Sequence, residues 1–235
     1  MNEDLLAAAV AAAEAGGEVL RQRFGDSSLD VQAKSENDFV TLADRESEQA
    51  VLGCLAERFP DHRVLSEEAG YQGGDASEFE WIVDPLDGTT NFLQGLPTYA
   101  VSIACRKGDQ MLVAAILAPD RGDLFTASYG GGASWNGRPL EVSSREGLKG
   151  AFLATGYPFR AKAALDLYLD VFRDVFLDAR AIRRCGAAAL DLAYTAAGIF
   201  DGFFEFRLSA WDVAAGSLLI EEAGGVVSDL DGGRD

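Results

Sequence analysis

The chain has 235 residues, of which 48% are hydrophobic and 25% are charged. These values are ordinary for a globular protein, and they exclude a disordered chain or a coiled coil. Its 20 basic and 38 acidic residues give a net charge of −18. This charge argues against a nucleic-acid partner, because a broad negative field repels phosphate backbones.

The chain carries no sign of a membrane segment or a secretory signal. No apolar run reaches the roughly 18 to 20 residues that a membrane span needs. The N-terminus is acidic where a signal peptide would be basic. Cys54, Cys105 and Cys185 are scattered and have no metal-binding spacing. We interpret them as reduced thiols and expect a cytoplasmic protein.

The expected helices and strands follow from apolar periodicity and from Gly and Pro positions. In chain order they are a helix at 4–24, an extended segment at 38–41, a helix at 44–59, strands at 64–65, 80–84, 99–105, 111–117, 124–128, 133–135 and 150–155, a helix at 163–176, a strand at 179–183, a helix at 187–197, a strand at 200–206, a helix at 211–223 and a strand at 226–228. Antiparallel strands come first and alternating strands and helices follow. We therefore expect an α+β fold with an α+β half at 1–140 and an α/β half at 141–235.

The sharpest local feature is the segment 84–92, which reads DPLDGTTNF. Asp84 and Asp87 follow a buried strand that we expect to end at Pro85. Residues 88–90 then offer backbone N–H groups and hydroxyls where a helix begins, which is an arrangement that binds phosphate. Carboxylates beside such a cradle are compatible when Mg²⁺ lies between them and the phosphate. An Asx-Pro turn followed by a capped helix is the alternative.

Two further acidic features suit the same chemistry. Glu67 and Glu68 stand at a strand end, and Asp212 stands at the start of a strongly apolar helix. The alternatives are a solvated glutamate pair and a plain helix cap. His62 is the only histidine and lies in a polar loop, so we expect it to be solvated and exclude a histidine triad. The glycines at 130–132 lack the lysine of a P-loop and predict a turn.

Several spaced motifs resemble those of the inositol monophosphatase family of metal-dependent phosphomonoesterases, in its bacterial branch. They cover nearly the whole chain: 81–92, 211–216 with 222–225, Lys34 with 38–44, and 183–194. The resemblance implies a layered αβαβα sandwich. It also implies a mobile loop at Lys34.

The family resemblance implies two Mg²⁺ ions held by oxygen atoms. Glu67, Asp84 and the carbonyl of Leu86 would hold the first ion. Asp84, Asp87 and Asp212 would hold the second, so that Asp84 bridges the two. A third, weaker ion would lie beside the first, at the glutamate pair.

The same resemblance implies roles around the phosphate. Gly88, Thr89 and Thr90 would cradle it. Asp44 and Thr89 would orient and deprotonate a metal-bound water that attacks phosphorus in line with the leaving alkoxide. No cysteine, serine or histidine nucleophile is then required.

The substrate alcohol would lie among Glu205, Ala188 and the Asp87 side. Ser209 stands where animal members carry a histidine, which leaves the preferred leaving group open. Arg207 either stays on the surface or contacts a second phosphate. Because Glu205 would repel a second phosphate, we expect a polyol monophosphate.

The function implied by the resemblance is hydrolysis of myo-inositol monophosphate or a similar small polyol phosphate by a Mg²⁺-dependent enzyme. Such an enzyme would be a homodimer and sensitive to lithium. The alternatives are a fructose-1,6-bisphosphatase, a histidinol-phosphatase or a nucleotide phosphatase of the same family. A regulatory protein on this fold that associates with RNA polymerase or ribosomal factors is the alternative from another class. The expected partner is a small phosphorylated metabolite, with no membrane and nucleic acid unfavoured.

Overall fold

The computed structural model describes the chain except residues 27–30, 36–37, 74–76, 160, 230–231 and 234–235. The side chains of residues 31–40 lie outside the described part as well, and Lys34 is among them. No helix within the described residues combines the length and the hydrophobicity needed to cross a membrane.

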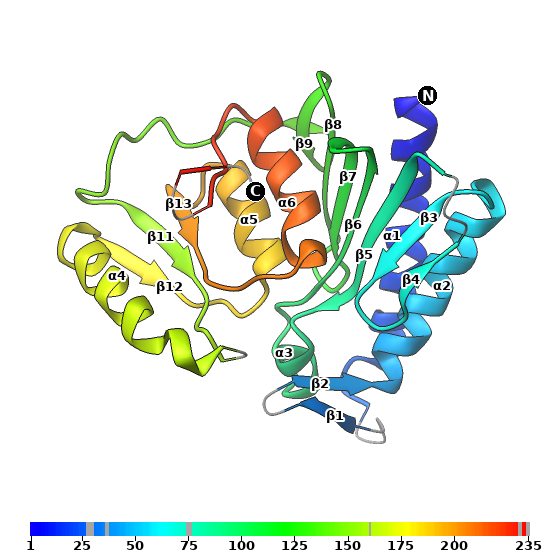
Figure 1. Ribbon diagram of the computed structural model, residues 1–235, viewed down its shortest axis with the longest axis horizontal. Helices are drawn as coiled ribbons and strands as arrows, with labels where there is room; N and C mark the ends of the chain where they lie inside the picture. The colour runs from blue at the N-terminus through cyan, green and yellow to red at the C-terminus, as the bar shows by residue number, and fades with distance from the viewer. Residues whose placement is uncertain (27–30, 36–37, 74–76, 160, 230–231, 234–235) are drawn as a thin grey trace.

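The described residues form five layers, alternating helices and sheets (Figure 1). Helices α1 (Asn2–Arg23) and α2 (Leu42–Arg58) form the outer layer on one side. An eight-stranded sheet follows, then helices α5 (Ala188–Ala196) and α6 (Ala210–Glu222). A three-stranded sheet and helix α4 (Leu165–Asp178) complete the other side. The expected α+β fold and αβαβα sandwich are confirmed.

The large sheet has the order β10-β9-β8-β7-β6-β5-β3-β4 and is antiparallel except for the parallel pair β3–β5. Its strands are β3 (Arg63–Ser66), β4 (Gly70–Gln72), β5 (Phe79–Asp87), β6 (Ala100–Lys107), β7 (Gln110–Ala118), β8 (Asp123–Ser128), β9 (Gly132–Trp135) and β10 (Arg138–Pro139). Its central strands are apolar on both faces because helices cover both.

The small sheet is parallel, with β11 (Phe152–Thr155) between β12 (Ala181–Arg183) and β13 (Gly202–Phe204). The remaining elements are an antiparallel pair, β1 (Val31–Ser35) and β2 (Asp38–Thr41), the short helix α3 (Thr89–Leu93) and the 3-10 turn η1 (Lys162–Ala164). Antiparallel pairing in the first part of the chain and parallel pairing in the second agree with the expected sequence of elements.

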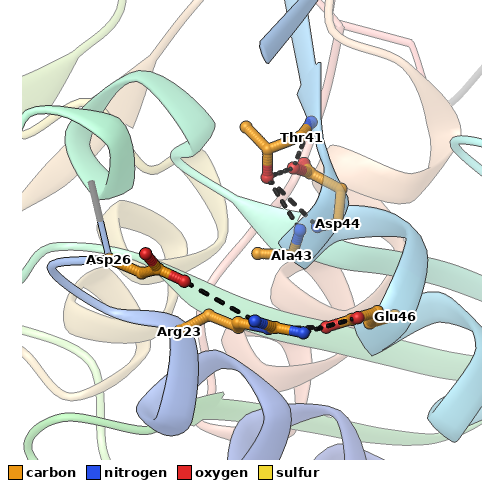
Figure 2. Close-up of polar contacts among 6 residues, drawn as sticks. All are labelled: Arg23, Asp26, Thr41, Ala43, Asp44 and Glu46. Atoms are coloured by element: carbon orange, nitrogen blue, oxygen red, sulfur yellow. Dashed lines mark hydrogen bonds and ion pairs between the residues drawn. The ribbon is translucent and has the colours of Figure 1, made fainter. Parts of the chain in front are cut away.

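Helix α1 packs closely on α2 because small residues line its buried face. A Cβ atom on Gly16 would lie 2.8 Å from the Ser47 hydroxyl oxygen and 2.8 Å from a methyl of Val51. Arg23 near the end of α1 pairs with Glu46 of α2 at 2.7 Å and with Asp26 at 3.5 Å (Figure 2). These contacts hold α2 against α1.

The prediction that the strand stops at Pro85 was wrong. Strand β5 runs on to Asp87, and its register with β6 shifts between the pairs Asp84–Ser102 and Asp87–Ala100. The shift adds one residue to β5, which is a bulge, and a bulge tolerates a proline without an N–H group. In a regular strand, residues three apart face opposite sides. The extra residue lets Asp84 and Asp87 face the same cavity.

Two smaller predictions were also wrong. Residues 226–228 form no strand, and the side chain of Val226 is 82% exposed. His62 is not simply solvated: its ring is stacked between Phe59 and Phe79, with centroid distances of 4.7 Å to each. Burial lowers the pKa of His62, so the neutral ring is favoured. The expected glycine turn at 130–132 is present, between β8 and β9.

Candidate functional site

A cavity of about 360 Å³ lies where the end of β5 meets the N-terminal ends of α3, α5 and α6. Residues from both parts of the chain line it. They include the predicted metal-binding and phosphate-binding residues Glu67, Asp84, Leu86, Asp87, Gly88, Thr89, Thr90 and Asp212. The predicted substrate residues Ala188, Glu205 and Arg207 line it too. Asp44, predicted as catalytic, and Glu68, predicted beside the weaker ion, are not among the residues that line it.

Asp84 lies on the cavity wall with only 1% of its surface exposed. Its Oδ1 accepts a hydrogen bond from the N–H of Leu86 at 3.0 Å. Burial raises the pKa of Asp84 well above its usual range, and the charges of Glu67 and Asp87 raise it further. The ionised form of this carboxylate therefore needs a cation close by.

Asp87 connects the first part of the chain to helix α5. Its two oxygens accept hydrogen bonds from the N–H groups of Ala188 at 3.2 Å and Ala189 at 2.8 Å. Burial raises the pKa of Asp87 well above its usual range, with Asp212 the next cause. The helix N-terminus orients the carboxylate, but its hydrogen bonds do not offset the effect of burial on the pKa of Asp87.

Asp212 serves as part of the helix cap and also lines the cavity. It is the third residue of α6, and its Oδ2 accepts the N–H of Ser209 at 2.7 Å. The helix cap considered as an alternative is therefore present. It does not exclude a ligand role, because a carboxylate has further lone pairs and Asp212 shares the cavity with Asp84 and Asp87.

Gly88 begins the turn that precedes helix α3. Its φ of +88° is in the left-handed region, and a Cβ atom there would lie 2.9 Å from the carbonyl oxygen of Thr98. Only glycine fits both the backbone conformation and the space. Asn91 donates from Nδ2 to the carbonyls of Thr98 at 2.7 Å and Cys185 at 3.0 Å. The second bond ties helix α3 to the other part of the chain.

Thr89 and Asp44 form a hydrogen-bonded pair at the edge of the cavity. The Thr89 hydroxyl lies 3.1 Å from Asp44 Oδ1 and 3.1 Å from the Leu86 carbonyl oxygen, two acceptors for its single proton. Asp44 Oδ2 accepts from the N–H and the hydroxyl of Thr41 at 2.8 and 2.6 Å (Figure 2). Burial is the largest cause that raises the pKa of Asp44, against the lowering effect of these hydrogen bonds.

The opposite end of the cavity is formed by the α/β part of the chain. The Glu205 carboxylate lies against Gly156, because a Cβ atom on Gly156 would overlap it at 1.9 Å. Arg207 lines the cavity with a φ of +63°, which is rare for a side-chain-bearing residue. These two residues bring a carboxylate and a guanidinium to the cavity wall.

Sequence reasoning did not single out Arg184 as a cavity residue, nor the aromatic pair beside it. The guanidinium of Arg184 lies 5.5 Å from the ring centre of Tyr157 and 5.6 Å from that of Phe159. Asp191 was missed too: it is buried in the cavity wall, and burial raises its pKa to about 7. No spacing signal could reveal these residues, since only folding brings 157–159, 184 and 191 together.

The acidic side chains share a wall but do not enclose one point. Across the described ranges, no three Asp, Glu, His or Cys side chains are drawn together as in a filled metal centre. The donor set nevertheless fits Mg²⁺: carboxylate and carbonyl oxygens are hard donors, and Mg²⁺ completes its shell with waters and substrate phosphate oxygens. The buried, mutually repelling carboxylates of Asp84 and Asp87 point to the same requirement.

The chain is similar in sequence to known bacterial proteins. The Nus factor SuhB of Pseudomonas aeruginosa is 45% identical over 99% of this chain and 88% of its own length. The Nus factor SuhB of Escherichia coli (strain K12) is 43% identical over 100% of this chain and 88% of its own length.

Solved structures share the fold. The extragenic suppressor protein suhB of Bartonella henselae superposes with a TM-score of 0.95 at 42% identity, covering 98% of this chain and 89% of that chain. The inositol monophosphatase of Anabaena superposes with a TM-score of 0.87 at 36% identity, covering 98% and 86%. The family model described as "Inositol monophosphatase family" matches residues 1–235. The chain therefore belongs to the inositol monophosphatase family.

Proposed function

We propose that this chain is a regulatory protein of the Nus-factor kind that retains a metal-dependent phosphomonoesterase site. The regulatory part is supported by the names of relatives that are 43% and 45% identical to it. The hydrolytic part is supported by one observation above all: buried carboxylates face a glycine-threonine helix start in a single cavity. The two roles are compatible because a protein surface and a cavity can serve different partners.

The cations of the hydrolytic site would be two Mg²⁺ ions, with a third bound more weakly. Glu67, Asp84 and the Leu86 carbonyl would hold the first, and Asp84 would share the second with Asp87 and Asp212. When bound, the ions neutralise charge on the phosphate oxygens and make a water easier to deprotonate. A homologous protein of 25% identity has been solved with Mg²⁺ and phosphate, which supports this choice of metal.

The chain's own groups would bind phosphate and move a proton. The backbone N–H groups of Gly88 to Thr90 would hold the phosphate oxygens at the start of α3. The Thr89 hydroxyl would orient the attacking water and pass a proton to Asp44 Oδ1, 3.1 Å away. The raised pKa of Asp44 suits this role, since a carboxylate of higher pKa accepts a proton more readily.

The test of the hydrolytic role is phosphate release from inositol 1-phosphate with and without metal. We expect activity to vanish in excess chelator and to return on addition of Mg²⁺, since ionised Asp84, Asp87 and Asp212 cannot otherwise share one cavity wall with a phosphate. Undiminished hydrolysis in chelator would refute the metal-dependent mechanism. The family resemblance further supports inhibition by Li⁺ in the same assay.

We propose a polyol monophosphate as the substrate, with the alcohol among Glu205, Ala188 and Asp87. Glu205→Gln should lower kcat/KM for inositol 1-phosphate by about tenfold, the loss of roughly one charge-assisted hydrogen bond. A simple aryl phosphate, which has no ring hydroxyls, serves as the control and should change little. A clear wild-type preference for fructose 1,6-bisphosphate that is lost in Arg207→Ala would overturn the monophosphate.

The regulatory role would be exercised through association with RNA polymerase or ribosomal factors. The expectation from net charge that nucleic acid is an unfavoured partner gains no support from relatives named Nus factors. We therefore propose that the chain acts in the transcription machinery. The cytoplasm, where that machinery works, is the corresponding location.

We also propose a homodimer and retain a division of the chain near residue 140. Helix α4 supports the homodimer, because it buries only Tyr168 and exposes apolar side chains over most of its length. These are Leu165, Leu167, Leu169, Phe176 and Leu177. Apolar surface gathered on one element is typical of an interface with another chain. The stretch between β10 and β11, which contains no helix or strand, supports the division into halves at 1–140 and 141–235.

A further inference from the structure

We propose that Glu48 of helix α2 is a positioning residue for Glu67, holding the turn that carries this glutamate toward the metal site. The inference rests on the proposed hydrolytic function of the cavity, and it adds a residue to which no role has been given above. Glu48 does not line the cavity, so it acts only through the turn that follows β3.

Glu48 is bonded to both ends of that turn. It is only 7% exposed, and its Oε1 accepts the Ser66 hydroxyl at 2.5 Å and the N–H of Ala69 at 3.0 Å. Ser66 immediately precedes Glu67, and Ala69 follows Glu68. A single oxygen atom therefore fixes the residues on either side of the glutamate pair.

The sheet fixes the backbone of Glu67 at the start of the turn. The pairing of β3 with β5 ends at Ser66 opposite Val83, and the N–H of Glu67 donates to the Val83 carbonyl at 3.1 Å. Past this point the chain leaves the ladder and turns back into β4, which pairs with β3 from Gly70. The bond from the N–H of Ala69 to Glu48 fixes the backbone at the far end of the turn.

Helix α2 contacts the other parts of the site through the same face. Asp44, one turn before Glu48, accepts the Thr89 hydroxyl, and the Ser47 hydroxyl donates to the Pro85 carbonyl at 2.8 Å. Residues 44, 47 and 48 share one face of a helix. One rigid element thus aligns the two segments that carry most of the proposed ligands, the turn after β3 and the segment 84–92.

A buried carboxylate is costly, and in the part of the chain that the structure describes no lysine or arginine forms an ion pair with Glu48. Two explanations of its presence differ in what they demand. Positioning requires an acceptor oxygen at this place, which glutamine also offers. A general contribution of negative charge to the cation site requires the ionised group, which glutamine lacks.

The experiment measures Mg²⁺ binding by isothermal titration calorimetry on the full chain after removal of metal, well below the unfolding temperature of each variant. Glu48→Ala should weaken Mg²⁺ binding by about tenfold or more, the usual effect of removing a group that orients a metal ligand. Glu48→Gln should stay within about threefold of the wild type, since the acceptor remains. Glu57→Ala is the matched control: it lies on the same helix, its side chain is exposed, and it should bind Mg²⁺ as the wild type does.

Ser66→Ala keeps the carboxylate and removes one of its two donors, so it should weaken binding by an intermediate factor. It keeps the proposal testable if Glu48→Ala does not fold. Wild-type Mg²⁺ affinity in both Glu48→Ala and Ser66→Ala would overturn the positioning role. Equal weakening in Glu48→Gln and Glu48→Ala would also overturn it, in favour of charge. A wild-type chain that binds no Mg²⁺ would instead refute the proposed hydrolytic function, and this inference with it.

Discussion

Asp212→Asn is expected to lower phosphate release by orders of magnitude while the fold survives. Asparagine keeps an oxygen that can accept the N–H of Ser209, so the start of α6 stays capped. It removes the negative charge that would bind the second cation, and an uncharged amide oxygen attracts a divalent cation less strongly than a carboxylate does. The measurement is steady-state phosphate release, with circular dichroism to confirm the fold.

Asp109→Asn, in the exposed turn between β6 and β7, is the control for this change and should act like the wild type. Hydrolysis by Asp212→Asn at the wild-type rate would leave Asp212 as a helix cap alone. The variant also separates the two proposed roles. Binding to purified RNA polymerase in a pull-down should persist in Asp212→Asn, because the regulatory role does not depend on catalysis.

Asp84→Asn is expected to abolish tight Mg²⁺ binding and, in chelator, to make the protein more stable than the wild type at neutral pH. Burial raises the pKa of Asp84 in the folded chain above its unfolded value. The folded state then binds more protons than the unfolded state at pH values between the two, so wild-type stability falls as pH rises through that window. Asparagine stays neutral and escapes this loss.

The pH dependence of the stability difference provides the control for this experiment. The stability difference between Asp84→Asn and wild type should be small near about pH 4, where the unfolded aspartate is itself half protonated, and should grow toward about pH 8. Urea unfolding in excess chelator at several pH values measures it. A variant less stable than the wild type across this range would contradict the claim that folding raises the pKa of Asp84.

Much of the fold follows from local pattern, and the exceptions have physical causes. The long apolar strands and the amphipathic helices could be predicted because burial on one or both faces sets their periodicity. The extension of β5 through Pro85 could not, since a bulge depends on the register of the neighbouring strand β6. The stacking of His62 between Phe59 and Phe79 likewise depends on segments that meet only after folding.

The candidate site divides in the same way. Asp84, Asp87 and the helix start at Thr89 are adjacent in sequence, so their convergence could be inferred from spacing. Glu67 and Asp212 could be singled out as acidic residues at the ends of elements, but only the family resemblance gave them and Asp44 their roles, because no local pattern distinguishes a ligand from a solvated glutamate or a capping aspartate. The contacts of Arg184 and Glu48 are with residues far away in the chain, and neither gives a signal in the sequence around it.

The carboxylate of Asp87 has a consequence for how the molecule is held together. It comes from the large sheet but accepts the first N–H groups of α5, while Asn91 reaches across to the carbonyl of Cys185. The junction between the two parts of the chain and the proposed cation site thus share one side chain. Whatever binds at Asp87 in the folded state alone also stabilises that junction by linkage. Loss of the ions would then weaken the junction between the large sheet and α5, so the proposed cations would serve the stability of the fold as well as hydrolysis.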